Sequence, residues 1–206
     1  MHLLQHAADA VQRAQRGNTK LPPAMFQQPG MSSARVRILL NELCAFDACR
    51  YLEIGSWKGS TLLAASYRNP GTFLGVDNFT EFGGSPDDFV QHTHAWYRDC
   101  RFRLLQTDAW ALDPAQVAPI DVYFYDGGHT EDEQYRAFTH FTDAFADTFI
   151  AVVDDWNELP VRHGTLRAFL DLRYRVLQDW DLFTDGNPDR GGWWNGVYVA
   201  VVSKPQ

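Results

Sequence analysis

The sequence has few cysteines, and no two of them stand in a Cys-x-x-Cys spacing. An odd number of cysteines in a chain of 206 residues indicates reduced thiols in the cytosol. We therefore expect Cys44, Cys49 and Cys100 to be buried or incidental thiols. The sequence also lacks an apolar run long enough to cross a bilayer, and polar side chains interrupt its first residues too often for a signal peptide. A cytoplasmic protein is the expectation.

Positive charge is scarce as well. The formal net charge is -8 at pH 7, which argues against nonspecific binding to nucleic acid or to an anionic membrane, because both need a basic surface. In the absence of repeats and low-complexity segments, we expect residues 1–206 to form a single domain. Residues 1–30 would be a peripheral helix followed by a candidate lid over residues 25–31, for which a surface linker is the alternative.

Short apolar runs alternate with helical patterns along the chain. Strands are expected at 50–54, 72–77, 102–106, 120–125, 148–153, 174–180 and 197–202. Helices are expected at 3–16, 34–46, 61–67, 87–99, 130–145 and 162–172. Acids and glycines follow several of the strand-like runs. This alternation predicts an α/β fold, a doubly wound Rossmann-like sheet with helices on both faces.

The stretch from Tyr51 to Thr61 predicts a ligand site over a strand-to-helix turn. An apolar strand ends there in Glu53, and Gly55 and Gly59 let the main chain turn tightly and approach a ligand. Ser60 or Thr61 is expected to cap the helix that follows. The glycine spacing is not that of a dinucleotide fold, since Trp57 occupies the middle position. An ordinary turn without a ligand is the alternative.

A second acidic residue supports the prediction of a ligand site. Asp77 ends the second predicted strand, 24 residues after Glu53. In a doubly wound sheet this end lies beside the first glycine turn, where a carboxylate can accept both hydroxyl groups of a ribose. The alternative is an aspartate that only caps the next turn.

The glycine motif resembles the first motif of class I S-adenosylmethionine-dependent methyltransferases, in the E-x-G-x-x-x-G-[ST] form of small-molecule O-methyltransferases. The resemblance implies a seven-stranded sheet with an antiparallel last strand. It also implies that the Gly55–Ser60 loop holds the methionine end of the cofactor, while Asp108 binds the adenine. The implied cofactor residues are Glu53, Gly55, Ser56, Trp57, Gly59, Ser60, Asp77, Asn78, Asp108, Ala109, Trp110 and Asp126.

Three further aspartates end the fourth and fifth predicted strands. Asp126, Asp154 and Asp155 are expected to meet at one edge, because the carboxyl ends of parallel strands face the ligand. Such carboxylates repel one another, and nearby only Arg136 and Arg162 offer compensation. A divalent ion bound by oxygen ligands relieves the repulsion, with magnesium favoured and calcium or manganese as alternatives.

The D-G-x-H pattern at Asp126 and the D-D pair at Asp154 sharpen the resemblance. Both look like small bacterial methyltransferases related to the macrolide and aminocoumarin sugar O-methyltransferases, and more distantly like catechol O-methyltransferase. Carried over, Asp126, Asp154 and Asp155 are the metal ligands. The catechol enzymes have asparagine at the third position, and their lysine base has no counterpart here.

A base is therefore sought among nearby histidines. His129 is the first candidate, because it stands beside the metal ligands and titrates near neutral pH; Asp126 can also take a proton. His163 is the second candidate. The alternatives are that His129 caps the helix predicted from residue 130 and that His163 is a surface residue.

The sequence thus predicts an enzyme that transfers a methyl group from S-adenosylmethionine to an oxygen of a small hydroxylated acceptor, either a sugar or a secondary metabolite. The alternatives are a metal-independent O- or N-methyltransferase, a noncatalytic S-adenosylmethionine-binding protein, and a two-metal hydrolase. The loop 185–196 exposes Trp193 and Trp194, which would border the acceptor pocket or make the contact of a homodimer.

Overall fold

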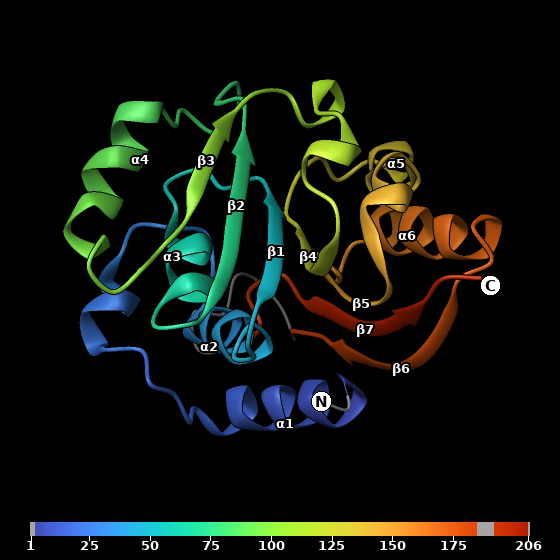
Figure 1. Ribbon diagram of the computed structural model, residues 1–206, viewed down its shortest axis with the longest axis horizontal. Helices are drawn as coiled ribbons and strands as arrows, with labels where there is room; N and C mark the ends of the chain where they lie inside the picture. Colours follow the sequence, from blue (N-terminus) through green and yellow to red (C-terminus); the bar gives the residue numbers. More distant parts are fainter. Residues whose placement is uncertain (1–2, 185–191, 206) are drawn as a thin grey trace.

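The computed structural model describes residues 3–184 and 192–205, which contain one seven-stranded sheet. The strands are β1 (Cys49–Ile54), β2 (Gly71–Asp77), β3 (Arg103–Gln106), β4 (Ile120–Tyr125), β5 (Phe145–Val153), β6 (Arg175–Leu182) and β7 (Val197–Ser203). Their order across the sheet is β3-β2-β1-β4-β5-β7-β6 (Figure 1). Strand β7 pairs antiparallel with both neighbours, and the pairs among β1 to β5 are parallel. The predicted Rossmann-like α/β fold is confirmed.

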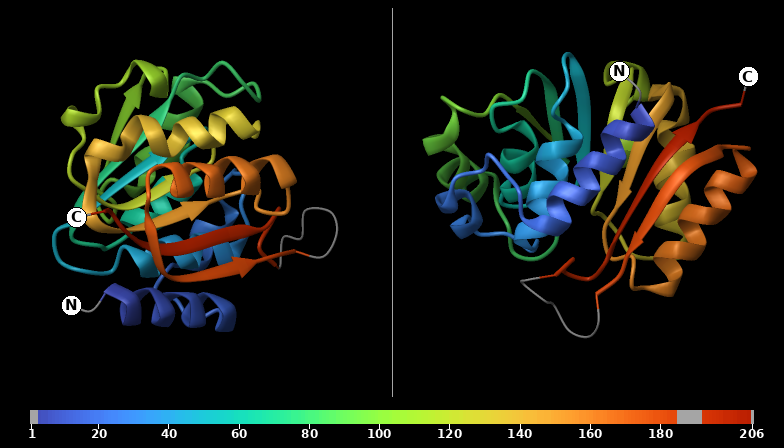
Figure 2. Two further views of the ribbon diagram at one scale, coloured as in Figure 1. Left: turned by 90° about the vertical axis from the view of Figure 1, so that its right-hand side faces the viewer. Right: turned by 90° about the horizontal axis from the view of Figure 1, so that it is seen from below.

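Helices cover both faces of the sheet. They are α1 (Leu3–Arg16), α2 (Ala34–Leu43), α3 (Ser60–Ser66), α4 (Pro86–Thr93), α5 (Glu131–Phe141) and α6 (Leu159–Asp171). Short 3-10 turns add η1 (Pro23–Gln27), η2 (His94–Trp96), η3 (Ala109–Ala111), η4 (Pro114–Gln116) and η5 (Thr142–Ala144). The right-hand view of Figure 2 shows β7 and β6 between α1 on one side and α6 on the other. No helix in the described ranges is long and apolar enough to span a bilayer.

Alternation along the central strands builds two cores. Tyr51 and Phe124 belong to the core under α1, α2 and α3, whereas Leu52 and Tyr123 belong to the core under α5 and α6. Successive side chains of a strand point to opposite faces, so strands buried on both faces read as continuous apolar runs. That is why the sequence pattern revealed these strands. The three cysteines are buried and free, as expected.

Several element ends differ from the predicted ones. The expected helix 130–145 stops at Phe141, because a 3-10 turn leads into β5 already at Phe145. The cap of α3 is Gly59, at a φ of +82° and without a side-chain hydrogen bond, so the expectation that Ser60 or Thr61 caps this helix was wrong. A left-handed N-cap position favours glycine over any hydroxyl residue.

The main chain ties the carboxyl ends of the central strands together. Asp126 N donates to Ile54 O at 2.9 Å, and Asp154 N donates to Tyr125 O at 3.1 Å. Gly55, at a φ of +91°, lies so close to β4 that a Cβ on it would run into the carbonyl oxygen of Asp126. A side chain is therefore excluded at Gly55, and the acids that follow β4 and β5 are held next to the first turn.

Candidate functional site

A cavity of about 290 Å³ lies at the carboxyl edge of the sheet. It is lined by ten of the twelve predicted cofactor residues: Gly55, Ser56, Trp57, Ser60, Asp77, Asn78, Asp108, Ala109, Trp110 and Asp126. The predicted metal ligands Asp154 and Asp155 and the predicted base His129 line the same cavity. The structure thus brings together residues from five separate strand ends. This is the position at which open α/β sheets bind ligands.

Glu53 and Gly59 are the two predicted cofactor residues that do not line the cavity. The Glu53 side chain is 0% exposed, and its Oε2 accepts a hydrogen bond from the Tyr51 hydroxyl at 2.7 Å. Burial raises the pKa of Glu53 to about 7, against the opposing effect of the Tyr51 hydrogen bond. Gly59 instead packs its Cα against the side chains of Phe89 and Thr93.

The carboxylates of Asp77 and Asp108 are fixed by the main chain beside them. Asp77 Oδ2 accepts from Trp57 N at 2.7 Å, and its Oδ1 accepts from Phe79 N at 2.6 Å. Asp108 Oδ1 accepts from Trp110 N at 2.8 Å. Asp77 therefore caps the next turn, as the alternative reading had it, and it also faces the cavity. Each carboxylate oxygen keeps a lone pair for a ligand.

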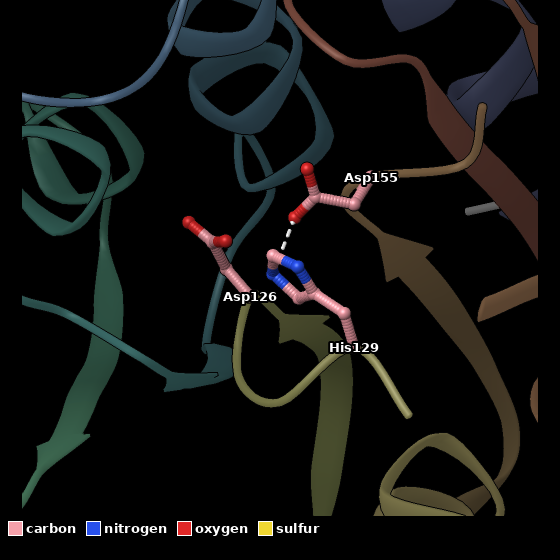
Figure 3. A group of neighbouring side chains, drawn as sticks. All are labelled: Asp126, His129 and Asp155. Carbon is pink, nitrogen blue, oxygen red and sulfur yellow. Dashed lines mark ion pairs between the residues drawn. The ribbon is translucent and has the colours of Figure 1, made fainter. Parts of the chain in front are cut away.

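Asp126, His129 and Asp155 form a compact group whose ligand atoms all lie within 4.8 Å of one another. Figure 3 shows the His129 ring next to both carboxylates and facing Asp155. The distance from His129 Nε2 to Asp155 Oδ2 is 2.9 Å. Asp155 adopts a left-handed φ of +54°, and its Oδ1 accepts from Asn195 Nδ2 at 2.8 Å. Both oxygens of Asp155 are thus held in place.

Asp154 lies at the inner wall of the cavity. It is 3% exposed, and its Oδ1 has no hydrogen-bond partner within the described part of the chain. Burial and the neighbouring carboxylates raise the pKa of both Asp126 and Asp154 well above their ordinary values. The cluster therefore favours any cation that offsets its charge.

His129 is the histidine of the site. The hydrogen bond to Asp155 raises its pKa to about 9, so the ring is protonated at neutral pH in this arrangement. The N-cap of α5 is Thr130, whose side chain forms a capping box with Glu133, so the alternative that His129 caps this helix was wrong. His163 is exposed on α6 and does not line the cavity.

The cavity also includes residues that sequence reasoning did not select. Examples are Ser32 just before α2, Thr107 after β3, Glu81 and Phe82 between β2 and α4, and Asn195 before β7. These residues stand in loops whose course depends on tertiary contacts, so no local pattern marks them. A second hollow of about 520 Å³ adjoins the first, and His129, Glu81 and Phe82 line both.

The two tryptophans before β7 have different positions. Trp193 is 6% exposed and belongs to the hydrophobic core, so the expectation that it is exposed was wrong. Trp194 is half-buried and lines the cavity, which favours the pocket over the dimer contact for this residue. Residues 185–191 of the predicted loop lie outside the described ones. Met31, at the end of the candidate lid, also lines the cavity.

A comparison with protein families agrees with this geometry. A family model described as a methyltransferase domain matches residues 52–156, from β1 to just past Asp155. The chain belongs to this family. Family and fold agree with the resemblance to class I S-adenosylmethionine-dependent methyltransferases that the glycine motif indicated. No match to a curated protein was found.

Solved structures share the fold. The O-methyltransferase from Bacillus cereus in complex with SAH is 13% identical, with a TM-score of 0.58, over 97% of this chain and 91% of that one. Cofactor-bound Rv0187 from MTB is 16% identical, with a TM-score of 0.61, over 98% and 90%. TrmN from Thermus thermophilus is 14% identical, with a TM-score of 0.61, over 88% of this chain and 52% of that one. The chain thus spans about half the length of TrmN and, at 48%, of a Streptococcus mutans protein.

The buried Glu53 predicts a pH-dependent stability. Its pKa is about 7 in the folded protein against an ordinary 4.5, so the folded state binds the proton more tightly. The contribution of Glu53 to the free energy of unfolding is fully present below about pH 4.5. It decreases by about 3 kcal/mol as the pH rises to about 7. Urea unfolding should show a loss that is smaller by this amount in Glu53→Gln, which keeps an acceptor for Tyr51, than in the wild type. Part of the pH dependence remains in the variant, because the raised pKa of Asp126 and Asp154 acts in the same direction. Identical pH profiles of the two proteins would contradict the assignment.

Proposed function

We propose that this protein is a divalent-metal-dependent O-methyltransferase that acts on a small hydroxylated acceptor. The observation that carries the proposal is the cavity that joins the acid-lined nucleoside wall at Asp77 and Asp108 to the cluster of Asp126, Asp154 and Asp155. One wall suits the methyl donor, and the other suits a cation that activates a hydroxyl group.

The cavity wall fits S-adenosylmethionine. Asp77 would accept hydrogen bonds from the ribose, and Asp108 would accept one from the adenine amino group, beside Ala109 and Trp110. Ser56 Oγ and Trp57 Nε1 are buried without a hydrogen-bond partner in the described residues, which supports a polar ligand at the first turn. When bound, the cofactor supplies a sulfonium methyl group for in-line displacement. The chain's role is to hold the acceptor oxygen at that methyl group.

The acid cluster fits a magnesium ion. Asp126, Asp154 and Asp155 offer oxygen ligands, and the free Oδ1 of Asp154 together with the raised pKa of Asp126 and Asp154 supports a bound cation. Calcium or manganese would suit the same ligands. When bound, the ion lowers the pKa of an acceptor hydroxyl group.

His129 is the proposed base, with Asp126 as the second proton acceptor. With Asp155 uncompensated, His129 keeps its proton at neutral pH, since the carboxylate raises its pKa to about 9. A cation on Asp155 would offset this charge and lower the pKa of His129, so that the ring can take the acceptor's proton. The alternative role, His129 as a ligand, is suggested by its place in the compact group with Asp126 and Asp155.

The acceptor would approach through the second hollow. His129 lines that hollow and the cavity, so a molecule seated there reaches the base. Phe82 and Pro160 give the hollow apolar walls, while Glu81 and Glu131 give it polar ones. Such a mixed surface suits a sugar or a hydroxylated ring, and the net charge of -8 disfavours a nucleic acid.

Replacement of Asp77 is expected to weaken cofactor binding. Asp77→Ala removes the proposed ribose acceptor, and two charge-assisted hydrogen bonds of about 1.5 kcal/mol or more each correspond to about a hundredfold loss of affinity or more. Titration calorimetry with S-adenosylmethionine measures it. Asp113→Ala is the matched control, because Asp113 caps a turn in the same way but does not line the cavity. Unchanged affinity of Asp77→Ala would remove Asp77 from the site.

Replacement of Asp154 is expected to impair metal-dependent turnover without impairing cofactor binding. Asp154→Asn keeps the shape but not the charge of the ligand, so magnesium-dependent turnover should fall about a hundredfold or more, while S-adenosylmethionine binds as before. EDTA should abolish turnover of the wild type. Asp147→Asn, an exposed position on the same strand, should change neither property. Turnover that persists in EDTA would favour a metal-independent enzyme.

Replacement of His129 is expected to slow the proton transfer. His129→Gln should lower kcat about a hundredfold to ten-thousandfold at unchanged cofactor affinity. His163→Gln on the exposed face of α6 should leave kcat unchanged. Magnesium affinity decides between the two roles. If His129 is the base, His129→Gln should bind magnesium as the wild type does; if His129 is a metal ligand, the variant should bind magnesium more weakly. Wild-type kcat in His129→Gln would exclude both.

A further inference from the structure

Arg37 is a buried charge that the site described so far does not use. It stands in the first turns of α2 and is 3% exposed. Its Nη1 donates to Met25 O at 2.9 Å and to Gln28 O at 3.0 Å, and its Nε donates to Ser32 Oγ at 3.0 Å. All of these acceptors are neutral, and no carboxylate among residues 3–184 and 192–205 forms an ion pair with Arg37. A buried guanidinium of this kind strongly attracts an anion.

The guanidinium lies directly behind one wall of the cavity. Ser32 and Ser60 form that wall, with their hydroxyl oxygens 3.5 Å apart. Gly30 passes between Ser60 and Arg37: a Cβ on it would overlap the Ser60 side chain and lie 2.9 Å from Arg37 Nη2. Ser32, Ser60 and the main chain of Gly30 therefore lie between the charge and the cavity. Since Ser32 Oγ accepts its hydrogen bond from Arg37, its own proton is free to be donated.

The rest of the cavity disfavours the binding of an anion. Seven acidic residues line it: Asp77, Glu81, Asp108, Asp126, Glu133, Asp154 and Asp155. None of the described residues that line it is a lysine or an arginine. A carboxylate in this cavity is repelled from the ribose wall and from the acid cluster alike. The Ser32–Ser60 wall differs from these walls, because the guanidinium of Arg37 lies behind it.

We propose that Arg37 is the positioning residue for the methionine carboxylate of S-adenosylmethionine. It acts through its charge and by orienting the Ser32 hydroxyl group toward the carboxylate. The inference rests on the proposed function and on the expectation from the sequence that the methionine end lies at the neighbouring Gly55–Ser60 loop. The same guanidinium holds Met25 and Gln28, so the carboxylate and the segment before α2 share one anchor.

The test compares two ligands that differ only in the carboxylate: S-adenosylhomocysteine and its decarboxylated analogue. Calorimetry should show that the wild type prefers the carboxylate-bearing ligand by about tenfold to a hundredfold. Arg37→Gln should lose most of this preference while it binds the decarboxylated ligand like the wild type, and Arg37→Lys should restore part of it. Arg35→Gln, on the same helix and without a hydrogen bond to the cavity wall, is the matched control and should keep the preference.

Other outcomes overturn the inference. If Arg37→Gln weakens both ligands equally, the residue has a purely structural role. Should that variant not fold, Ser32→Ala keeps the guanidinium and removes the hydroxyl relay; an unchanged preference in Ser32→Ala then overturns the proposal. A wild type that binds neither ligand contradicts the proposed function itself, whereas a wild type that binds both equally contradicts only the role of Arg37.

Discussion

The repulsion between Asp126, Asp154 and Asp155 is the constraint on which the site depends. Left to themselves, three carboxylates that lie so close together separate or become protonated. Here the main chain prevents separation, because Asp126 and Asp154 are each tied by a backbone hydrogen bond to the neighbouring strand end. The repulsion is reduced in two ways. His129 pairs with Asp155, and the raised pKa of Asp126 and Asp154 favours their neutral forms. A fold that forces like charges together creates a place for a cation.

Charge is also what divides the cavity into regions. Acids line the wall proposed for the nucleoside and the wall with the acid cluster, whereas the wall near α2 has hydroxyl groups with a guanidinium behind them. S-adenosylmethionine has a nucleoside at one end and a carboxylate at the other, so its polarity matches that of the cavity in one orientation. The reverse orientation would set the carboxylate against Asp77 and Asp108. If the proposed site holds the cofactor, electrostatics would therefore favour one orientation of it.

The sequence predicts the sheet well because its central strands are buried on both faces, so each is a short, continuous apolar run. It predicts the acids of the site for a related reason: strand ends can be located, and parallel strands bring their ends to one edge. Glu53 shows the limit, since the motif marks its importance but not that its side chain points beneath the cavity floor. Ser32, Asn195 and Arg37 could not be found, because their partners are 28 or more residues away or lie in irregular segments.

Because β7 lies inside the sheet, the site is completed by residues that are synthesised late. This strand inserts between β5 and β6, and the residues just before it bring Trp194 and Asn195 to the cavity. A nascent chain that has been synthesised only as far as β5 already contains the acid cluster, but not the amide that holds Asp155. The central strands must keep one edge open until β7 arrives. Asp155 therefore gains its Asn195 partner only after the chain has been synthesised as far as the residues just before β7.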